Sequence, residues 1–366
     1  MVQAFELYSA TWLGGRTRNV GLAFKSAAWR HRYIHALAFG TLALAAGVGA
    51  LTGNRPDIGI VGEFGFYITS AFWIGGCAAA VIYLLWLGLV ERARSPLRHF
   101  ARRIGEFFMN AERWANAVNG IGAFVAFAAG FSVLKGAITY FAPFSWDATL
   151  ADWGLALHFG RAPYEWLWWF IERPAAVYAL NIVYNLWFIV LLGTTFAASI
   201  TVKDTKLRHQ YLLSLLSLWL IGGFFVAMLF SSAGPCYFQR LNLGDRYQPL
   251  MEALAHANQS YPIWALSTQD MLWSGYKGLR NGNLGISAFP SLHVGTSVLI
   301  AIYASRRSWL VGVMAWLFAA TITVGSVVLG WHYGLDAYGG GLIAVAIWAG
   351  VGRILNRATP SALSSV

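Results

Sequence analysis

The amino-acid sequence predicts an all-α fold, a polytopic membrane bundle of about eight transmembrane helices. Of the 366 residues, 58% are hydrophobic and only 11% are charged, and the mean hydropathy is +0.55. A soluble domain carries a charge on about a quarter of its residues. The apolar residues also form long runs, which are typical of membrane-spanning helices.

A transmembrane helix needs about 20 mostly apolar residues to cross the hydrocarbon core of a bilayer. Eight stretches meet this requirement or come close to it, and the sixth is the shortest. They cover 33–52, 66–90, 118–140, 175–200, 210–232, 291–305, 308–330 and 335–353. The basic segment 91–117 is amphipathic, so it is either a surface helix that contacts anionic lipid or a solvated linker.

Positively charged residues alternate with the apolar runs. They gather before the first span, after the second, between the fourth and fifth, between the sixth and seventh, and after the eighth. Eight spans place all these clusters on one side, which the positive-inside rule assigns to the cytoplasm. We therefore expect an integral protein of a bacterial-type inner membrane with both termini cytoplasmic. Topology then explains the net charge of +11, and no nucleic-acid partner is expected.

Polar residues collect at helix ends that this topology places on the extracytoplasmic side. The stretch "SSAGPCYFQRLNLGDRY" (231–247) leaves the fifth span, and "GISAFPSLHVGTSV" (285–298) enters the sixth. A third stretch, "GSVVLGWHYGLDAYGG" (325–340), joins the seventh span to the eighth. Because two spans separate His293 from His332, both histidines should lie near the same surface.

His332 and Asp336 are four residues apart, so they would share one face of a helix. A carboxylate beside an imidazole fixes its tautomer and raises its basicity, and an oriented imidazole can act as a nucleophile. His293 could then donate a proton to a leaving group. Backbone amides at the start of a helix also favour a bound phosphate. The pattern fits phosphoryl transfer through a covalent phosphohistidine.

Other uses of these residues are compatible with the sequence. A haem or metal site would use His293, His332 and Asp336, but no further ligand cluster accompanies them. Cys77 and Cys236 support neither a disulfide framework nor a zinc site. A transporter with a proton relay, or a non-catalytic scaffold, is the main rival. A transporter predicts polar residues at mid-span, whereas those of this sequence gather at span ends.

The two histidine motifs resemble those of the type-2 phosphatidic acid phosphatase superfamily. "PSLH" (290–293) is similar to its Pro-Ser-x-His motif, and "HYGLD" (332–336) is similar to its His-x-x-x-Asp motif. The leucine at 292, the His-Tyr pair and "SSAGPCYF" (231–238) look like the inositolphosphotransferase branch, which includes inositol phosphorylceramide synthase. The resemblance covers roughly residues 118–353.

This resemblance implies three parts of the chain. Residues 118–353 would form a six-helix, phosphatase-type catalytic core. Residues 1–117 would hold the cytoplasmic N-terminus, two additional transmembrane helices and the amphipathic segment. Residues 354–366 would form a disordered tail.

The resemblance also implies roles for single residues. His332 would be the nucleophile, Asp336 would orient it, His293 would protonate the leaving group, and no metal or other cofactor would be needed. The family's arginine six residues before the nucleophile is replaced here by Ser326, and its Lys-x₆-Arg-Pro motif has no match. Because a transferred phosphate needs a cation, loop residues are candidates, Arg240 first. The predicted phosphate-binding residues are Ser291, Arg240, Arg246, Lys277, Arg280 and Ser326.

The sequence thus predicts a metal-independent enzyme with its active site on the extracytoplasmic side of the membrane. Its partners would be membrane lipids, with a phospholipid or a polyprenyl phosphate as substrate, and its oligomeric state is left open. The resemblance favours transfer of a phosphoinositol-type head group. Hydrolysis of phosphatidate or polyprenyl pyrophosphate is the alternative.

Overall fold

The computed structural model describes residues 20–54, 58–92, 94–279 and 285–358. The described residues form helices and no strand, so the predicted all-α fold is confirmed. The predicted cytoplasmic N-terminus and disordered tail fall largely on 1–19 and 359–366, outside the described residues.

Within the described residues, six helices are long and apolar enough to cross a membrane. They are α2 (Arg32–Thr52), α5 (Ala111–Phe141), α8 (Pro174–Ile200), the helical run Thr205–Leu229, α14 (Trp309–Val328) and α15 (Leu335–Ala358). The other two predicted spans contain shorter apolar helices, Trp73–Leu89 within α3 (Ile58–Leu89) and α13 (Leu292–Ser305). At 1.5 Å per residue α13 is roughly 21 Å long, too short to cross a bilayer core alone.

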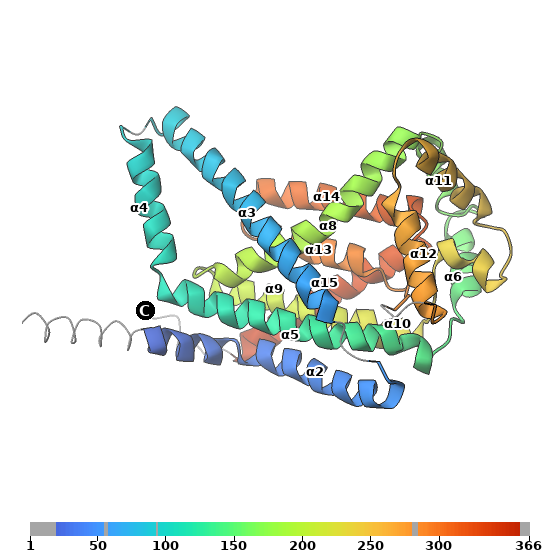
Figure 1. Ribbon diagram of the computed structural model, residues 1–366, viewed down its shortest axis with the longest axis horizontal. Coiled ribbons are helices and arrows are strands. Elements are labelled where there is room, and N and C mark those ends of the chain that lie inside the picture. Colours follow the sequence, from blue (N-terminus) through green and yellow to red (C-terminus); the bar gives the residue numbers. More distant parts are fainter. Residues whose placement is uncertain (1–19, 55–57, 93, 280–284, 359–366) are drawn as a thin grey trace, which may run out of the picture.

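The bundle helices lie mainly along the long axis of the molecule (Figure 1). The connecting helices α6, α11 and α12 gather at one end, whereas α4 lies toward the other (Figure 1). The remaining bounds are α4 (Pro96–Phe108), α6 (Asp147–Leu157), η1 (Glu165–Leu167), α7 (Trp168–Ile171), η3 (Pro235–Tyr237), η4 (Gln239–Leu241), α11 (Gln248–Ser260) and α12 (Trp264–Tyr276).

Helix α13 has a central position, because it contacts α8, α9, α14 and α15. The run Thr205–Leu229 consists of α9 (Thr205–Ser217), the π-helical segment η2 (Leu218–Val226) and α10 (Ala227–Leu229). Within η2, a Cβ on Gly223 would lie 2.6 Å from the Leu292 side chain and 2.8 Å from that of Phe131. A side chain at 223 would therefore push α13 away from η2 and α5.

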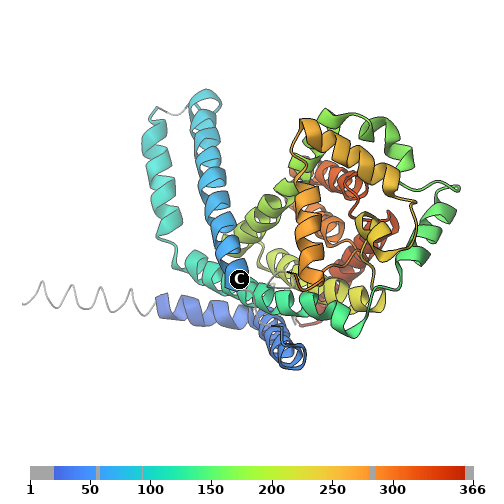
Figure 2. The same ribbon diagram turned by 45° about the vertical axis from the view of Figure 1, so that its right-hand side comes forward.

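Helices α3 and α4 stand beside the main bundle (Figure 2). None of the α4 side chains is buried, and the helix starts at Pro96, which suits the first turn of a helix. The predicted boundary after residue 117 falls inside α5, and the predicted tail from 354 begins inside α15. The division into an N-terminal addition and a catalytic core stays a prediction.

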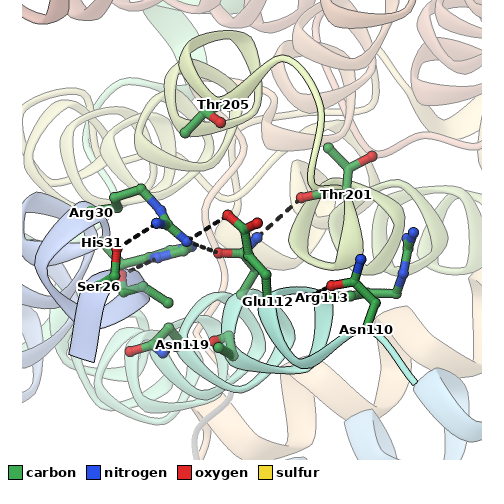
Figure 3. Close-up of polar contacts among 12 residues, drawn as sticks. Ser26, Arg30, His31, Asn110, Glu112, Arg113, Asn119, Thr201 and Thr205 are labelled. Atoms are coloured by element: carbon green, nitrogen blue, oxygen red, sulfur yellow. Dashed lines mark hydrogen bonds and ion pairs between the residues drawn. The ribbon is translucent and has the colours of Figure 1, made fainter. Parts of the chain in front are cut away.

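A buried polar cluster joins α2 to the other helices at the end opposite α12. Fully buried Arg208 donates to the Asn116 side-chain oxygen at 3.0 Å, to the Thr201 carbonyl at 2.8 Å and to His31 Nε2 at 3.2 Å. Arg30 forms an ion pair with Glu112 at 2.9 Å (Figure 3). These contacts fix the start of α2 against α5 and α9.

Candidate active site

His332 and Asp336 are in direct contact beside the turn between α14 and α15. His332 Nδ1 lies 3.2 Å from Asp336 Oδ2, and the same oxygen accepts the Tyr333 amide at 2.9 Å. Asp336 is fully buried. An ionised carboxylate only accepts hydrogen bonds, so Nδ1 carries the imidazole proton and Nε2 has the free lone pair. The lone pair of a nucleophile is thus placed on Nε2.

Ser291 brings the start of α13 to this nitrogen. Its hydroxyl oxygen caps α13 by accepting from the Val294 amide at 3.3 Å and lies 3.1 Å from His332 Nε2. Because Nε2 has the lone pair, the serine hydroxyl donates to it. The Ser291 amide donates to the Asp336 carbonyl at 2.9 Å, which joins the two histidine motifs directly.

The turn that carries His332 depends on glycine. Gly330 and Gly334 have φ values of +74° and +86°, which favour glycine. The amides of Trp331 and His332 both donate to the Ser326 carbonyl, at 3.1 and 3.0 Å. The Ser326 hydroxyl donates to Thr323 at 2.7 Å. Ser326, a predicted phosphate-binding residue, therefore organises this turn and is not in the cavity wall; its phosphate-binding role stays a prediction.

A cavity of about 500 Å³ opens beside the two histidines. Its lining is mainly apolar and aromatic and includes both His293 and His332. The His293 ring stacks on Tyr184 with centroids 4.7 Å apart and lies 4.1 Å from the Trp187 ring. The Trp187 indole donates to the His293 carbonyl at 3.0 Å. The predicted catalytic residues His332, His293 and Asp336 are thus brought together, with His293 held by aromatic rings from α8.

Asp147, the first residue of α6, connects the loop after the fifth span to the turn that carries His332, and this loop in turn contacts the segment before His293. This buried carboxylate accepts the amides of Ala233 and Gly234, at 2.9 and 2.8 Å, and the Tyr333 hydroxyl at 2.6 Å. Ser232 in turn accepts the amide of Ala288, just before Pro290, at 2.8 Å. Burial raises the pKa of Asp147, against the opposing effect of its hydrogen bonds from Tyr333, Gly234 and Ala233. Asp147 could not be recognised from the sequence, because its partners Ala233, Gly234 and Tyr333 lie far away in the chain.

The described loop cations Arg240, Arg246 and Lys277 lie outside the cavity lining. Arg240 is paired with Asp270 at 2.5 Å, and Arg246 with Asp152 at 2.8 Å. The Lys277 ammonium lies 5.3 Å from the centroid of the Trp273 ring. Arg280 falls outside the described residues. The proposed phosphate-binding role of these four residues stays a prediction.

Lys135 of α5 lines the cavity, and the sequence prediction had missed it. Its ammonium makes no hydrogen bond or ion pair with any residue that the structure describes. A signal was available, because Lys135 is the one charged residue of the predicted span 118–140. An ionisable side chain in an apolar span marks a candidate functional site.

Metal chemistry has no evident ligand set within the described part of the chain. No group of three or more His, Cys, Asp or Glu side chains converges there. The predicted independence from metals and other cofactors stays a prediction.

A membrane helix bundle with this histidine–carboxylate pair and second histidine at an apolar cavity belongs to the class of lipid phosphatases and phosphotransferases. The family model of the PAP2 superfamily matches residues 148–350, more than half of the chain, and the protein belongs to this superfamily. The match does not distinguish the inositolphosphotransferase branch. In comparisons with curated proteins and with solved structures, no significant match was found.

Proposed function

We propose that this protein is a membrane phosphotransferase that moves a phosphoinositol-type head group between lipids through a phosphohistidine on His332. One observation carries the proposal: His332 Nδ1 faces Asp336 while Nε2 faces Ser291 at the wall of the cavity that His293 also lines. The resemblance of 231–238 and 290–293 to the inositolphosphotransferase branch supports the choice of head group.

In the first half-reaction, His332 Nε2 attacks the phosphorus of the donor lipid. A nitrogen–phosphorus bond forms, and the bond between phosphorus and the lipid oxygen breaks with its electron pair on that oxygen. Protonated His293 gives its proton to the departing alcohol. Asp336 stabilises the positive charge that develops on the His332 ring, and the Ser291 hydroxyl, released from Nε2, can donate to a phosphoryl oxygen.

In the second half-reaction, an acceptor hydroxyl attacks the phosphorus of the phosphohistidine. Neutral His293 takes the proton of that hydroxyl, and the electrons of the nitrogen–phosphorus bond return to Nε2. A lipid hydroxyl as acceptor gives a new phospholipid. Water in the same position gives hydrolysis, so a phosphatase acting on phosphatidate or polyprenyl pyrophosphate is the alternative for the same residues.

The apolar walls of the cavity suit a lipid substrate in a bacterial-type inner membrane. Phe131, Trp187 and Trp219 line the cavity with the histidines. The proposed sidedness is supported by the separation in Figure 1, where basic α4 lies away from α6, α11 and α12. We place the active site at the extracytoplasmic face and both termini in the cytoplasm.

The test uses full-length protein in lipid nanodiscs and phosphatidylinositol labelled with ³²P. Wild-type protein should form a phosphoenzyme that is stable in alkali and labile in acid, as expected for a nitrogen–phosphorus bond, and should pass the label to a lipid acceptor. His332→Gln should remove both signals, and His293→Gln should remove lipid product. An exposed histidine on α11 supplies the control, His256→Gln, which should behave as wild type.

The products separate the remaining possibilities. Labelled inositol phosphate or free phosphate, without a new lipid, would assign the protein as a hydrolase. Full turnover by His332→Gln would overturn the proposed mechanism, whereas the absence of any turnover by the wild-type protein would favour a transporter or scaffold.

A further inference from the structure

The cavity carries positive charge without a fixed counter-charge. Among the described lining residues, Lys135 is the one Lys or Arg side chain, it lies with His293 and His332, and no Asp or Glu is present. Asp336 lies behind His332 and is fully buried, outside the lining. The cavity therefore lacks an anion, and a bound ligand can supply it.

The Lys135 ammonium has no carboxylate partner among the described residues, although α5 is a candidate membrane span. Two described cations of the neighbouring loops have carboxylate partners, Asp270 for Arg240 and Asp152 for Arg246. Lys135 has no such partner among the described residues. An unpaired charge at membrane depth is costly, and such residues pair with one another or serve a ligand or ion pathway.

Lys135 also lies next to the segment that leads into the histidine motif. A Cβ on Gly285 would collide with the Lys135 carbonyl, so the segment 285–291 packs directly on α5 at this position. That segment ends at Ser291, the N-cap of α13. The positive end of the α13 dipole therefore faces the same cavity, because Leu292 and His293 line it too.

We propose that Lys135 binds the phosphate of the substrate, and that its single charge selects a phosphodiester over a phosphomonoester. This inference rests on the proposed function, since it concerns the same cavity. Lys135 lies outside the matched range 148–350, so the family match does not assign it. Lys135 thus supplies, from α5, the positive charge that is missing at position 326, where this chain has Ser326 in place of the family's arginine.

The charge count explains the preference for a phosphodiester. A diester carries one negative charge, which one ammonium neutralises. A monoester carries about −1.5 to −2 at pH 7, and a pyrophosphate carries more. The cost of desolvating an ion grows with the square of its charge, whereas its attraction to Lys135 grows only linearly. While both cavity histidines are neutral, a dianion would leave one charge uncompensated in an apolar cavity.

The experiment measures binding to full-length His332→Gln protein in nanodiscs, which cannot form a phosphohistidine. Short-chain phosphatidylinositol is titrated by calorimetry at pH 7, the pH at which the charges were counted. Adding Lys135→Met should weaken binding about 10- to 100-fold, the range expected for a lost hydrogen bond to a charged group. Lys135→Arg should stay within about threefold. The matched control, exposed Lys206→Met on α9, should not change binding.

Two further arms complete the test. Short-chain phosphatidate should bind at least about tenfold more weakly than phosphatidylinositol, which corresponds to about 1.4 kcal/mol of binding free energy. Equal or tighter binding of phosphatidate would overturn the diester assignment. Unchanged phosphatidylinositol affinity in Lys135→Met, or a loss in Arg240→Gln alone, would overturn the assignment of Lys135. Failure of the proposed function appears separately, as turnover by His332→Gln. A thermal melt of Lys135→Met that matches its parent shows that the fold is intact.

Discussion

The Tyr333 hydroxyl donates to Asp147 across 2.6 Å, although the two residues are 186 positions apart. Tyr333 directly follows His332, and its amide donates to Asp336. Asp147 also accepts the amides of Ala233 and Gly234. One buried carboxylate thus fixes both the turn of the nucleophile and the loop that supports α13.

We expect Asp147→Asn to lower turnover without weakening substrate binding. The amide nitrogen would replace one carboxylate oxygen and point its N–H groups at a group that also donates, the Ala233 amide or, in the other orientation, the Gly234 amide and the Tyr333 hydroxyl, so the turn should lose its fixed position. A misplaced nucleophile lowers kcat by about 100-fold while KM changes little. Steady-state kinetics on phosphatidylinositol would measure this split. Asp152→Asn on the exposed side of α6 is the control, and an equal loss there would argue for a general effect on α6.

The same carboxylate should make stability depend on pH in a defined direction. Burial raises the pKa of Asp147 above its ordinary value of 3.8. The folded protein therefore takes up a proton at a pH where the unfolded chain does not, and protonation favours the fold. As the pH falls through the raised pKa toward 3.8, the Tm of wild type should rise relative to that of Asp147→Asn. A difference in Tm that is constant with pH would contradict this.

Tyr184 should affect the rate of the first half-reaction only when the leaving group needs a proton. Its ring stacks on His293 at 4.7 Å with an interplanar angle of 13°, and an aromatic face stabilises the imidazolium by about 1–2 kcal/mol. Tyr184→Leu should therefore slow head-group transfer from a lipid alcohol about tenfold. A p-nitrophenyl phosphodiester, whose leaving group departs without a proton, should release p-nitrophenolate in the first half-reaction at the wild-type rate.

The control for this prediction lies on the same helix. Tyr178 of α8 stacks on Tyr261 at 5.3 Å and does not line the cavity. Tyr178→Leu should leave both reactions unchanged. If Tyr184→Leu slowed both substrates equally, its ring would serve packing and not the proton transfer.

Cys236 reports on the packing of the loop that Asp147 holds. Its amide donates to the Gly330 carbonyl at 2.9 Å, and burial raises the pKa of its thiol. Because the thiolate is the reactive form, a raised pKa means slow alkylation. In a Cys77→Ala background, iodoacetamide at pH 8 should modify Cys236 at least about tenfold more slowly than in denaturant. Rapid labelling of the native protein, followed by mass spectrometry, would show that this loop opens.

The spans and the histidine pair could be predicted because their signals are local. Apolar runs and flanking charges define the helices, and the topology alone places His293 and His332 on one side. The contact of His332 with Asp336 was expected from helical spacing, but it is made across the turn at Gly334, just before α15 begins. The separation of four residues was informative although the local geometry differs.

The hydrogen bonds that hold the site in place, and the cation that faces the cavity, could not be derived from the sequence in the same way. Asp147 is one carboxylate among several in loops, and only the fold brings three distant donors to it. Arg240 lies in the expected loop, but the sequence does not show that Asp270 neutralises it. Lys135 was visible as a charge in an apolar span, and only the cavity shows what it faces.

Arg208 should carry much of the stability of the cluster that joins α2 to α5 and α9. Its guanidinium is fully buried and donates to Asn116, Thr201 and His31. Arg208→Met keeps the packing but leaves these acceptors unsatisfied, which should cost about 2–4 kcal/mol. Thermal unfolding in detergent should show a lower Tm, whereas exposed Lys206→Met on the same helix should not. The cluster lies at the end of the bundle away from α12 (Figure 1), so the folded variant should keep the wild-type KM. A loss of substrate affinity at unchanged Tm would show that this cluster is coupled to the cavity.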